Sequence, residues 1–297
     1  MASYLGARLW RSGRCHVTLV GTWTEGLDAI RRAGVRVEDQ DTRFTASPDV
    51  APLHEAPQCD LALVLVKSHQ TEAVASFVAS SLRDPGSALT LQNGLGNAKV
   101  LSAALGGKRL VLGVTSAGAT MVGPGCVRGF VAPTLLARDA HGAASGWRDL
   151  LAEAGLPCEV RDDLDSIVWR KLAINCAINP LSALTGLVNG ALLLSPEARN
   201  ILERTAREVG LVAAAKGVQG AASYAEAALE AARLTAENRS SMLQDLDRGA
   251  PTEIEVMNGA VVREADRLGI AVPMNRSLAE AVRAREASPR ALPRETS

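Results

Sequence analysis

The sequence predicts an α/β domain followed by an all-helical domain. Apolar, β-rich runs alternate with helix-like segments through the first half of the chain, which predicts a Rossmann-like, doubly wound and mostly parallel sheet. From Asp162 to about residue 285 the periodicity is helical, and β-rich runs almost disappear. We therefore place the boundary near residue 160, with the α/β domain at residues 1–161 and the helical domain at residues 162–297.

Composition limits the kind of protein this is. Hydrophobic residues make up 47% of the 297 residues, which is ample for the cores of two domains. Lys+Arg and Asp+Glu number 32 each, and this balance argues against nucleic acid or an acidic membrane surface as a partner. No apolar run approaches the roughly 18 residues of a membrane span, and no signal-peptide pattern is visible. The five cysteines form no Cys-x-x-Cys pair and the four histidines lack metal-ligand spacing, so we expect a cytoplasmic protein with reduced thiols and no metal site.

The expected elements follow one another in a regular order. A helix-like segment ends at Gly13, and the run at residues 61–66 is continuously apolar, as in a strand buried on both faces. Helices are expected at residues 69–82 and 96–105, and the tail after Ser288 is expected to fray. The other expected strands are at residues 15–20, 88–96 (ending in a glycine turn), 110–114, 126–131 and 134–137.

The start of the chain departs from the pattern of a dinucleotide-binding sheet. Such a sheet opens with a strand and a G-x-G-x-x-G turn that leads into a helix, and its first strand lies mid-sheet. Here Ala2 stands where the last glycine is expected and Gly6 lies inside the helix, so the sheet would have a gap lined by unpaired backbone groups. We favour a true start roughly ten residues upstream, with Met1 an internal methionine. The alternative is a chain that has lost cofactor binding; an intact mass from the native source that matches a start at Met1 would support it.

The turn after the second strand leaves the cofactor open. Dinucleotide folds place an acidic residue there for NAD, or an arginine nearby for the phosphate of NADP. This chain has no arginine at the turn, and its first acid is Glu25. The hydroxyls of Thr22 and Thr24 suit either a phosphate or the cap of the following helix.

A polar stripe marks the most informative segment, residues 169–186. Lys171, Asn175 and Asn179 stand at i, i+4 and i+8, which places them on one face of a helix. Their neighbours are strongly apolar, and buried polar groups need partners, so the stripe favours a functional site over a solvated face. Pro180 should disturb the helix and free the carbonyl of Cys176.

A second polar segment spans residues 236–262, and its pattern is ambiguous. Thr252 and Glu255 match a T-x-x-E capping box, which places Glu253 in the first turn of a helix with its carboxylate directed elsewhere. Asn238 and Ser241 are three residues apart, on one face of the preceding helix. Helix capping and surface polarity would explain most of this segment.

Together these segments resemble the ketopantoate reductase family. The family carries W-R-K-L-x-x-N-x-x-x-N-P-L and E-N-x-S-S-M-L-Q-D…T-E-I-x-x-x-N-G, and the chain holds both at a matching separation. It also has V-K at residues 66–67 after a buried strand and Q-N-G-x-G at residues 92–96. The resemblance spans about residues 2–285, and four motifs in order are far more specific than a lone glycine signature.

The resemblance implies an oxidoreductase that reduces 2-dehydropantoate (ketopantoate) to pantoate with NADPH, or NADH, in pantothenate and coenzyme A biosynthesis. It implies an active site in a cleft between the domains, with Lys171 as the general acid and Glu253 as the acidic residue near the developing hydroxyl. An ordinary lysine pKa near 10.4 would keep Lys171 protonated without a large shift. The resemblance also implies two sets of binding residues. Those expected to bind the substrate are Asn93, Asn175, Asn179, Asn238 and Ser241, and those expected to bind the cofactor are Lys67, Asn93 and Thr22.

Two other functions remain open. One is reduction of a different 2-keto acid, because the pocket that sets substrate size is not visible in the sequence. The other is a non-catalytic ligand-binding protein that has lost its cofactor; the missing glycine turn favours it, and Lys171 and Glu253 oppose it. The alanine-rich segment at residues 213–232 suits packing within the domain or against a second copy, which leaves a homodimer open.

Overall fold

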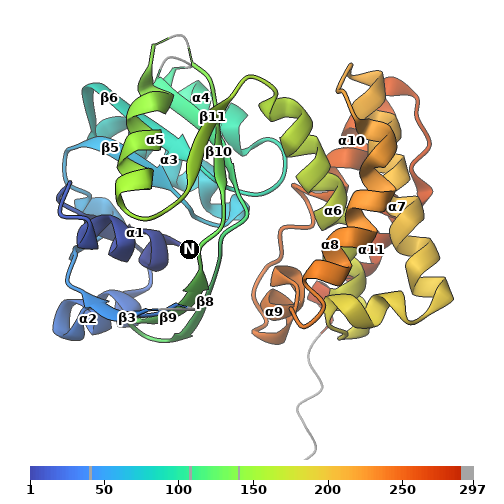
Figure 1. Cartoon of the computed structure of the whole chain (residues 1–297), viewed down its shortest axis with the longest axis horizontal. Helices are drawn as coiled ribbons and strands as arrows, with labels where there is room; N and C mark the ends of the chain where they lie inside the picture. Colours follow the sequence, from blue (N-terminus) through green and yellow to red (C-terminus); the bar gives the residue numbers. More distant parts are fainter. Residues whose placement is uncertain (40–41, 107–108, 140, 289–297) are drawn as a thin grey trace, which may run out of the picture. The chain divides into compact units, whose positions relative to one another are not determined.

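The computed structural model describes residues 1–39, 42–106, 109–139 and 141–288 (Figure 1). They form two compact units: residues 1–92 with 97–164, and residues 93–96 with the chain from Asp165 onward. The tail after Ser288, expected to fray, lies outside these ranges. Across the described ranges, no helix combines the length and the apolar character needed to cross a membrane.

The main sheet of the first unit confirms the predicted α/β class. Strands β5, β6 and β7 are parallel, while β10 runs antiparallel to β7 and parallel to β11. Helices α3 and α4 pack on one face of this sheet, and α1 and α5 contribute to the core on the other (Figure 1). In spatial order the strands are β11 (Cys158–Arg161), β10 (Thr134–Ala137), β7 (Leu110–Thr115), β6 (Leu82–Thr90) and β5 (Cys59–Val64). The helices are α1 (Ala2–Arg11), α3 (Thr71–Ser81), α4 (Asn97–Leu105) and α5 (Ala143–Glu153).

Two smaller sheets complete this unit. One pairs β1 (Thr18–Gly21) in parallel with β4 (Asp49–Pro52). The other has the order β3 (Arg43–Ala46), β2 (Val35–Glu38), β9 (Cys126–Phe130) and β8 (Gly118–Gly123). The run at residues 126–131 was predicted to be a strand, which is confirmed, and as β9 it pairs with β2 and β8 in the second of these sheets. Within the described ranges, β1 pairs with β4 alone and β5 with β6 alone.

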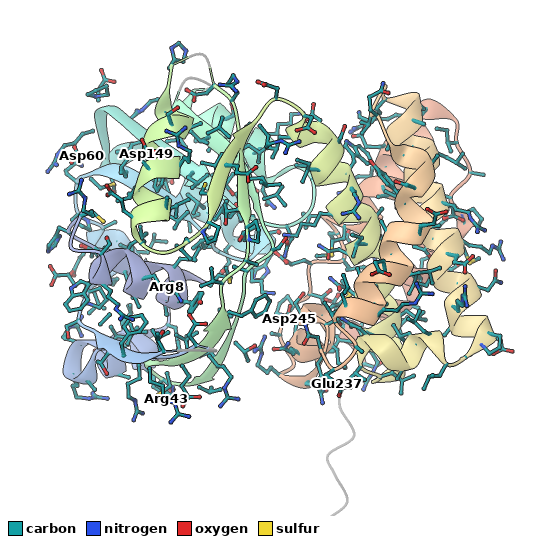
Figure 2. All side chains as sticks on the ribbon, in the orientation of Figure 1. Arg8, Arg43, Asp60, Asp149, Glu237 and Asp245 are labelled. Atoms are coloured by element: carbon teal, nitrogen blue, oxygen red, sulfur yellow. The ribbon has the colours of Figure 1, made fainter. Side chains whose placement is uncertain are left out.

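Helix α1 packs closely against the strands that follow it. A Cβ on Gly6 would lie 2.6 Å from the side chain of Leu19 in β1, so a glycine permits this approach. The Tyr4 hydroxyl donates to Asp39 Oδ2 at 2.7 Å, and the Arg8 guanidinium, labelled in Figure 2, donates to the same oxygen. Burial, reinforced by the hydrogen bond to Asp39, raises the pKa of Tyr4 to about 12. This cluster fixes α1 to the segment that follows β2.

The second unit is helical, as predicted. Its core includes the apolar side of α6, and the alanine-rich segment also packs into this core through Ala213, Ala221, Ala228 and Ala232. These alanines therefore pack within the unit. The helices are α6 (Leu164–Thr185), α7 (Pro196–Ala215), α8 (Tyr224–Leu234), α9 (Ser241–Asp247), α10 (Asn258–Leu268) and α11 (Pro273–Ala287), with a short 3₁₀ helix η4 (Asn189–Leu193) after α6.

Pro180 lies inside α6, and its predicted effect on Cys176 is confirmed. The helix continues through the proline, while the Cys176 carbonyl accepts a hydrogen bond from Asn258 Nδ2 of α10 at 3.0 Å. Asn258 Nδ2 also donates to Asn275 Oδ1 of α11 at 3.0 Å, and Asn275 Nδ2 donates to Glu208 Oε2 of α7 at 2.9 Å. Both asparagines are fully buried, so this network joins four helices beneath the polar stripe.

We predict that Asn258→Ala destabilises the chain by about 2–4 kcal/mol, because it removes the donor to two buried acceptors, the Cys176 carbonyl and Asn275 Oδ1. Urea unfolding measures the loss. The matched control is Asn200→Ala, which removes an exposed asparagine of α7 and should change the free energy of unfolding by less than about 0.5 kcal/mol. Equal stability of the two variants would contradict the structural role of Asn258.

Candidate active site

Helix α6 carries Lys171, Asn175 and Asn179 at one-turn spacing, as the sequence predicts. Burial increases along this stripe: Lys171 and Asn175 are half-buried, and Asn179 is 8% exposed. Asn179 Nδ2 lies 3.8 Å from the sulfur of Met257. The residues beside the stripe, Leu172 and Cys176 among them, belong to the core of the helical unit. The stripe is therefore polar along an otherwise apolar helix.

Lys171 does not keep the ordinary lysine pKa that the sequence led us to expect. Burial lowers the pKa of its ammonium to about 8, and the charge of the Glu253 carboxylate opposes this shift. The expectation failed because it took no account of lost hydration around the helix. At neutral pH the ammonium is still mostly protonated, and it is a stronger acid than an exposed lysine.

Glu253 lies in an irregular loop, residues 251–257, which we call the Glu253 loop. The predicted capping box is wrong, because α10 begins only at Asn258, with Met257 in the N-cap position. The Thr252 hydroxyl accepts from the Ile254 N–H at 3.2 Å, while the Glu255 carboxylate is engaged by Arg283. Glu253 is 7% exposed, so its carboxylate is buried within the unit where its charge acts on Lys171.

Asn238 and Ser241 do not share a helix face, so that prediction is also wrong. Helix α8 ends at Leu234, which leaves Asn238 in the connecting segment, and Ser241 is the first residue of α9. Both are exposed. The intervening Ser240 is 5% exposed; its hydroxyl accepts from the Leu243 N–H at 3.1 Å as the helix cap and donates to the Asn179 carbonyl at 3.4 Å. Ser240 therefore attaches this segment to α6.

The loop at residues 93–96 belongs to the helical unit and carries the half-buried Asn93. The Leu95 N–H donates to the Val256 carbonyl of the Glu253 loop at 2.8 Å. Gly94 has φ of +81°, and a Cβ there would lie 2.4 Å from the same carbonyl oxygen. Only glycine fits both conditions, so the glycine turn noted in the sequence lets the loop that carries Asn93 pack against the Glu253 loop.

Lys67 and Thr22 lie in the first unit. Lys67 follows β5, where Gln92 Nε2 donates to the Val66 carbonyl and to the Thr71 hydroxyl, each at 2.8 Å, and so joins the loops after β5 and β6. Thr22 follows β1 and is exposed. The N-cap position of the next helix, α2 (Thr24–Ala33), is held by Trp23, so neither Thr22 nor Thr24 caps that helix.

The structure thus gathers part of the candidate site. Lys171, Asn175 and Asn179 share α6, Glu253 acts on Lys171, and the loop that carries Asn93 is hydrogen-bonded to the Glu253 loop. Sequence reasoning missed the supporting residues: the cap Ser240, the amide Asn258 and the ion partners of Glu255. The contacts of Ser240 with Asn179, of Asn258 with Cys176 and of Arg283 with Glu255 join residues 28 to 82 positions apart, and no local pattern signals such pairs.

Known proteins resemble this chain over both units. A family model described as ketopantoate reductase PanE/ApbA matches residues 1–133, and one described as ketopantoate reductase PanE/ApbA C terminal matches residues 163–286. A 2-dehydropantoate 2-reductase from Halobacterium salinarum is 38% identical over 277 residues, which are 91% of each chain. The chain belongs to the ketopantoate reductase family. The resemblance noted in the sequence is confirmed.

Two solved structures of similar proteins cover nearly the whole chain. A PanE/ApbA family ketopantoate reductase from Ralstonia eutropha is 33% identical, with a TM-score of 0.87 and coverage of 95% of this chain and 94% of that one. The ternary structure of D-mandelate dehydrogenase with NADH and anilino(oxo)acetate is 25% identical, with a TM-score of 0.90 and coverage of 96% and 94%. The ketopantoate reductase family therefore shares its fold with an enzyme that binds a nicotinamide cofactor.

We predict that Glu253→Gln lowers the pKa of Lys171 below about 8, since it removes the charge that opposes the effect of burial and keeps the side-chain shape. NMR titration with ¹³Cε-labelled lysine measures this, and the chain has five lysines, so Lys171→Arg assigns the signal. Glu237→Gln, at an exposed carboxylate labelled in Figure 2, is the control. An unchanged pKa in Glu253→Gln would show that this carboxylate does not act on Lys171.

Proposed function

We propose that this chain reduces 2-dehydropantoate to pantoate with a reduced nicotinamide cofactor, NADPH in the first place and NADH as the alternative. The observation that carries the proposal is the half-buried Lys171 with the charge of Glu253 acting on it, in a chain of the ketopantoate reductase family. The reaction belongs to pantothenate and coenzyme A biosynthesis. Cys15, Cys59, Cys126, Cys158 and Cys176 are free thiols, which suits a reaction in the cytoplasm.

Lys171 is the proposed general acid. When bound, the cofactor supplies a hydride to the keto carbon, and negative charge develops on the keto oxygen. The Lys171 ammonium donates its proton to this oxygen, and its pKa of about 8 favours donation near neutral pH. The Glu253 carboxylate keeps the ammonium charged and accepts a hydrogen bond from the hydroxyl that forms. General acid catalysis of this kind contributes about 10²–10⁴-fold.

The other polar residues of the site suit a small hydroxylated keto acid. Asn175 is half-buried on α6, and Asn238 and Ser241 are exposed, so their amide and hydroxyl groups are accessible to the carboxylate and hydroxyl of a substrate. Asn179 contributes from the buried end of the stripe. Asn93 follows β6 and adds an amide from the loop that is bonded to Val256.

The described residues fit a dinucleotide cofactor in part. Thr22 and Lys67 follow the carboxyl ends of β1 and β5, the kind of position where α/β sheets bind dinucleotides. A hydroxyl and an ammonium are donors for phosphate or ribose oxygens, and Thr22 is exposed. Glu25 is also exposed, and its carboxylate suits a ribose hydroxyl better than a 2′-phosphate. NADH is therefore retained as the alternative to NADPH.

A second candidate is reduction of a 2-keto acid with an aromatic substituent. The TM-score of 0.90 with D-mandelate dehydrogenase favours it. Parallel assays with 2-dehydropantoate and phenylglyoxylate, each with NADPH and NADH, separate the two candidates. They are run on the 297-residue chain and on a version extended upstream through the expected glycine-rich turn. No oxidation of cofactor with either keto acid, in folded protein, would favour the non-catalytic binder.

We predict that Lys171→Ala lowers kcat by about 100-fold or more, because it removes the proton donor. The measurement is oxidation of the reduced cofactor with saturating 2-dehydropantoate. Lys216→Ala, at an exposed lysine of the same unit, is the control and should keep kcat within about twofold. A loss of less than about fivefold in Lys171→Ala would exclude the proposed role.

The pH dependence should follow the pKa of Lys171. The reaction needs the protonated ammonium, so kcat/KM should be level below about pH 8 and fall about tenfold per pH unit above it. Neither 2-dehydropantoate nor NADPH titrates between about pH 8 and 10, so the fall above pH 8 reports the enzyme. A profile that stays level to about pH 10 would mean that another group donates the proton.

A further inference from the structure

The Glu253 loop is irregular, yet two features of the site depend on it. It carries the buried Glu253, and its Val256 carbonyl accepts the Leu95 N–H at 2.8 Å. A segment outside helices and strands lacks their repeated backbone hydrogen bonds, so its shape depends on other contacts. Within the loop, the N–H groups of Val256 and Met257 donate to the Glu253 carbonyl at 3.2 Å each, and side chains of α10 and α11 add contacts on both sides of Glu253.

Helix α11 holds the loop on both sides of Glu253. Before it, the Thr252 N–H donates to Glu286 Oε1 at 2.7 Å. After it, Arg283 Nε and Nη2 donate to the two carboxylate oxygens of Glu255 at 2.5 and 3.2 Å, a forked pair. Arg263 of α10 adds a hydrogen bond from Nη2 to the Glu255 carbonyl at 2.8 Å. The backbone is therefore fixed one residue before Glu253 and two residues after it.

We propose that Arg283 is a positioning residue of the reaction, which through its forked pair with Glu255 keeps the Glu253 loop, and with it the Glu253 carboxylate, in place for Lys171. This inference rests on the proposed function. Arg283 acts through Glu255 and the loop, and it is not assigned a contact with substrate or cofactor. The competing explanation is an ordinary surface ion pair with no effect on the site.

The chain offers a matched control for this comparison. Arg276 on the same helix pairs with Asp266 of α10 at 2.5 Å, with side chains 47% and 56% exposed. In the Arg283–Glu255 pair the nitrogen and the carboxylate oxygen are also 2.5 Å apart, and the two side chains are 45% and 54% exposed. Exposed ion pairs contribute little to the free energy of unfolding, so both arginine variants should fold. The two pairs differ in that Arg283 is bonded to the Glu253 loop.

The sign of the pKa change distinguishes displacement of Glu253 from a direct charge effect. Glu253 raises the pKa of Lys171, so moving its carboxylate away lowers that pKa. Loss of a positive charge at Arg283, acting directly, would raise it. The other charged groups around Arg283 are Glu255, Glu280 and Glu286, and Arg263 remains on Glu255 when Arg283 is removed.

We expect Arg283→Ala to lower kcat by about tenfold, to change KM by less than about twofold, and to move the alkaline fall of kcat/KM to lower pH. Arg283→Lys, which keeps the charge but loses the fork, should recover part of kcat. Glu255→Gln removes the ion pairs with both Arg283 and Arg263, so it should lower kcat at least as much as Arg283→Ala, and adding Arg283→Ala to it should change little more. Arg276→Ala should stay within about twofold of the parent with an unchanged pH profile.

The pKa of Lys171 can be measured without catalytic turnover, so this inference can be tested separately from the proposed function. Titration of ¹³Cε-labelled lysine gives the pKa of Lys171 in the full-length parent, Arg283→Ala and Arg276→Ala, whether or not the chain reduces 2-dehydropantoate. A lower Lys171 pKa in Arg283→Ala alone supports the positioning role. An Arg283→Ala variant that matches Arg276→Ala in this pKa, or in which the pKa rises, overturns it.

Discussion

The proline at position 180 is the constraint on which the helical unit depends. Because proline has no N–H, the carbonyl of Cys176 must find its partner outside α6. The Asn258 amide is that partner, and Asn275 and Glu208 extend the network to α11 and α7. Breaking one of these bonds leaves a buried polar atom unpaired, which is costly at this depth. Four helices are thereby held together beneath the polar stripe of α6.

Burial of the stripe also sets the chemistry of Lys171. An ammonium loses favourable hydration when it leaves water, so burial favours the neutral amine. Glu253 opposes this by its charge, and the pKa of about 8 is the balance of the two effects. Deeper burial without a carboxylate would leave an amine that has no proton to donate, and full exposure would leave a weaker acid. The charge of Glu253 thus helps to keep Lys171 protonated.

The sequence alone was sufficient where the signal is local. The strand at residues 61–66, the stripe that begins at Lys171 and the carbonyl freed by Pro180 follow from helix and strand periodicity and from the missing N–H of proline. The expectation that this strand is buried on both faces was wrong, because Leu61 is 42% exposed in β5. The sequence alone was insufficient where contacts between distant segments determine the structure. No local spacing indicates that β9 pairs with β2 and β8, or that burial lowers the pKa of Lys171.

The failed capping box explains how the site is built. A helix that began at Glu253 would use the Val256 carbonyl for its own hydrogen bond to residue 260. Because α10 begins at Asn258 instead, that carbonyl accepts the Leu95 N–H, and Gly94 brings the two backbones into contact. The local pattern favours a helix, and tertiary contacts override it at the place where Glu253 and the loop of Asn93 meet. Conflict between local preference and tertiary structure is characteristic of functional sites, and here it exposes the backbone that joins two parts of the candidate active site.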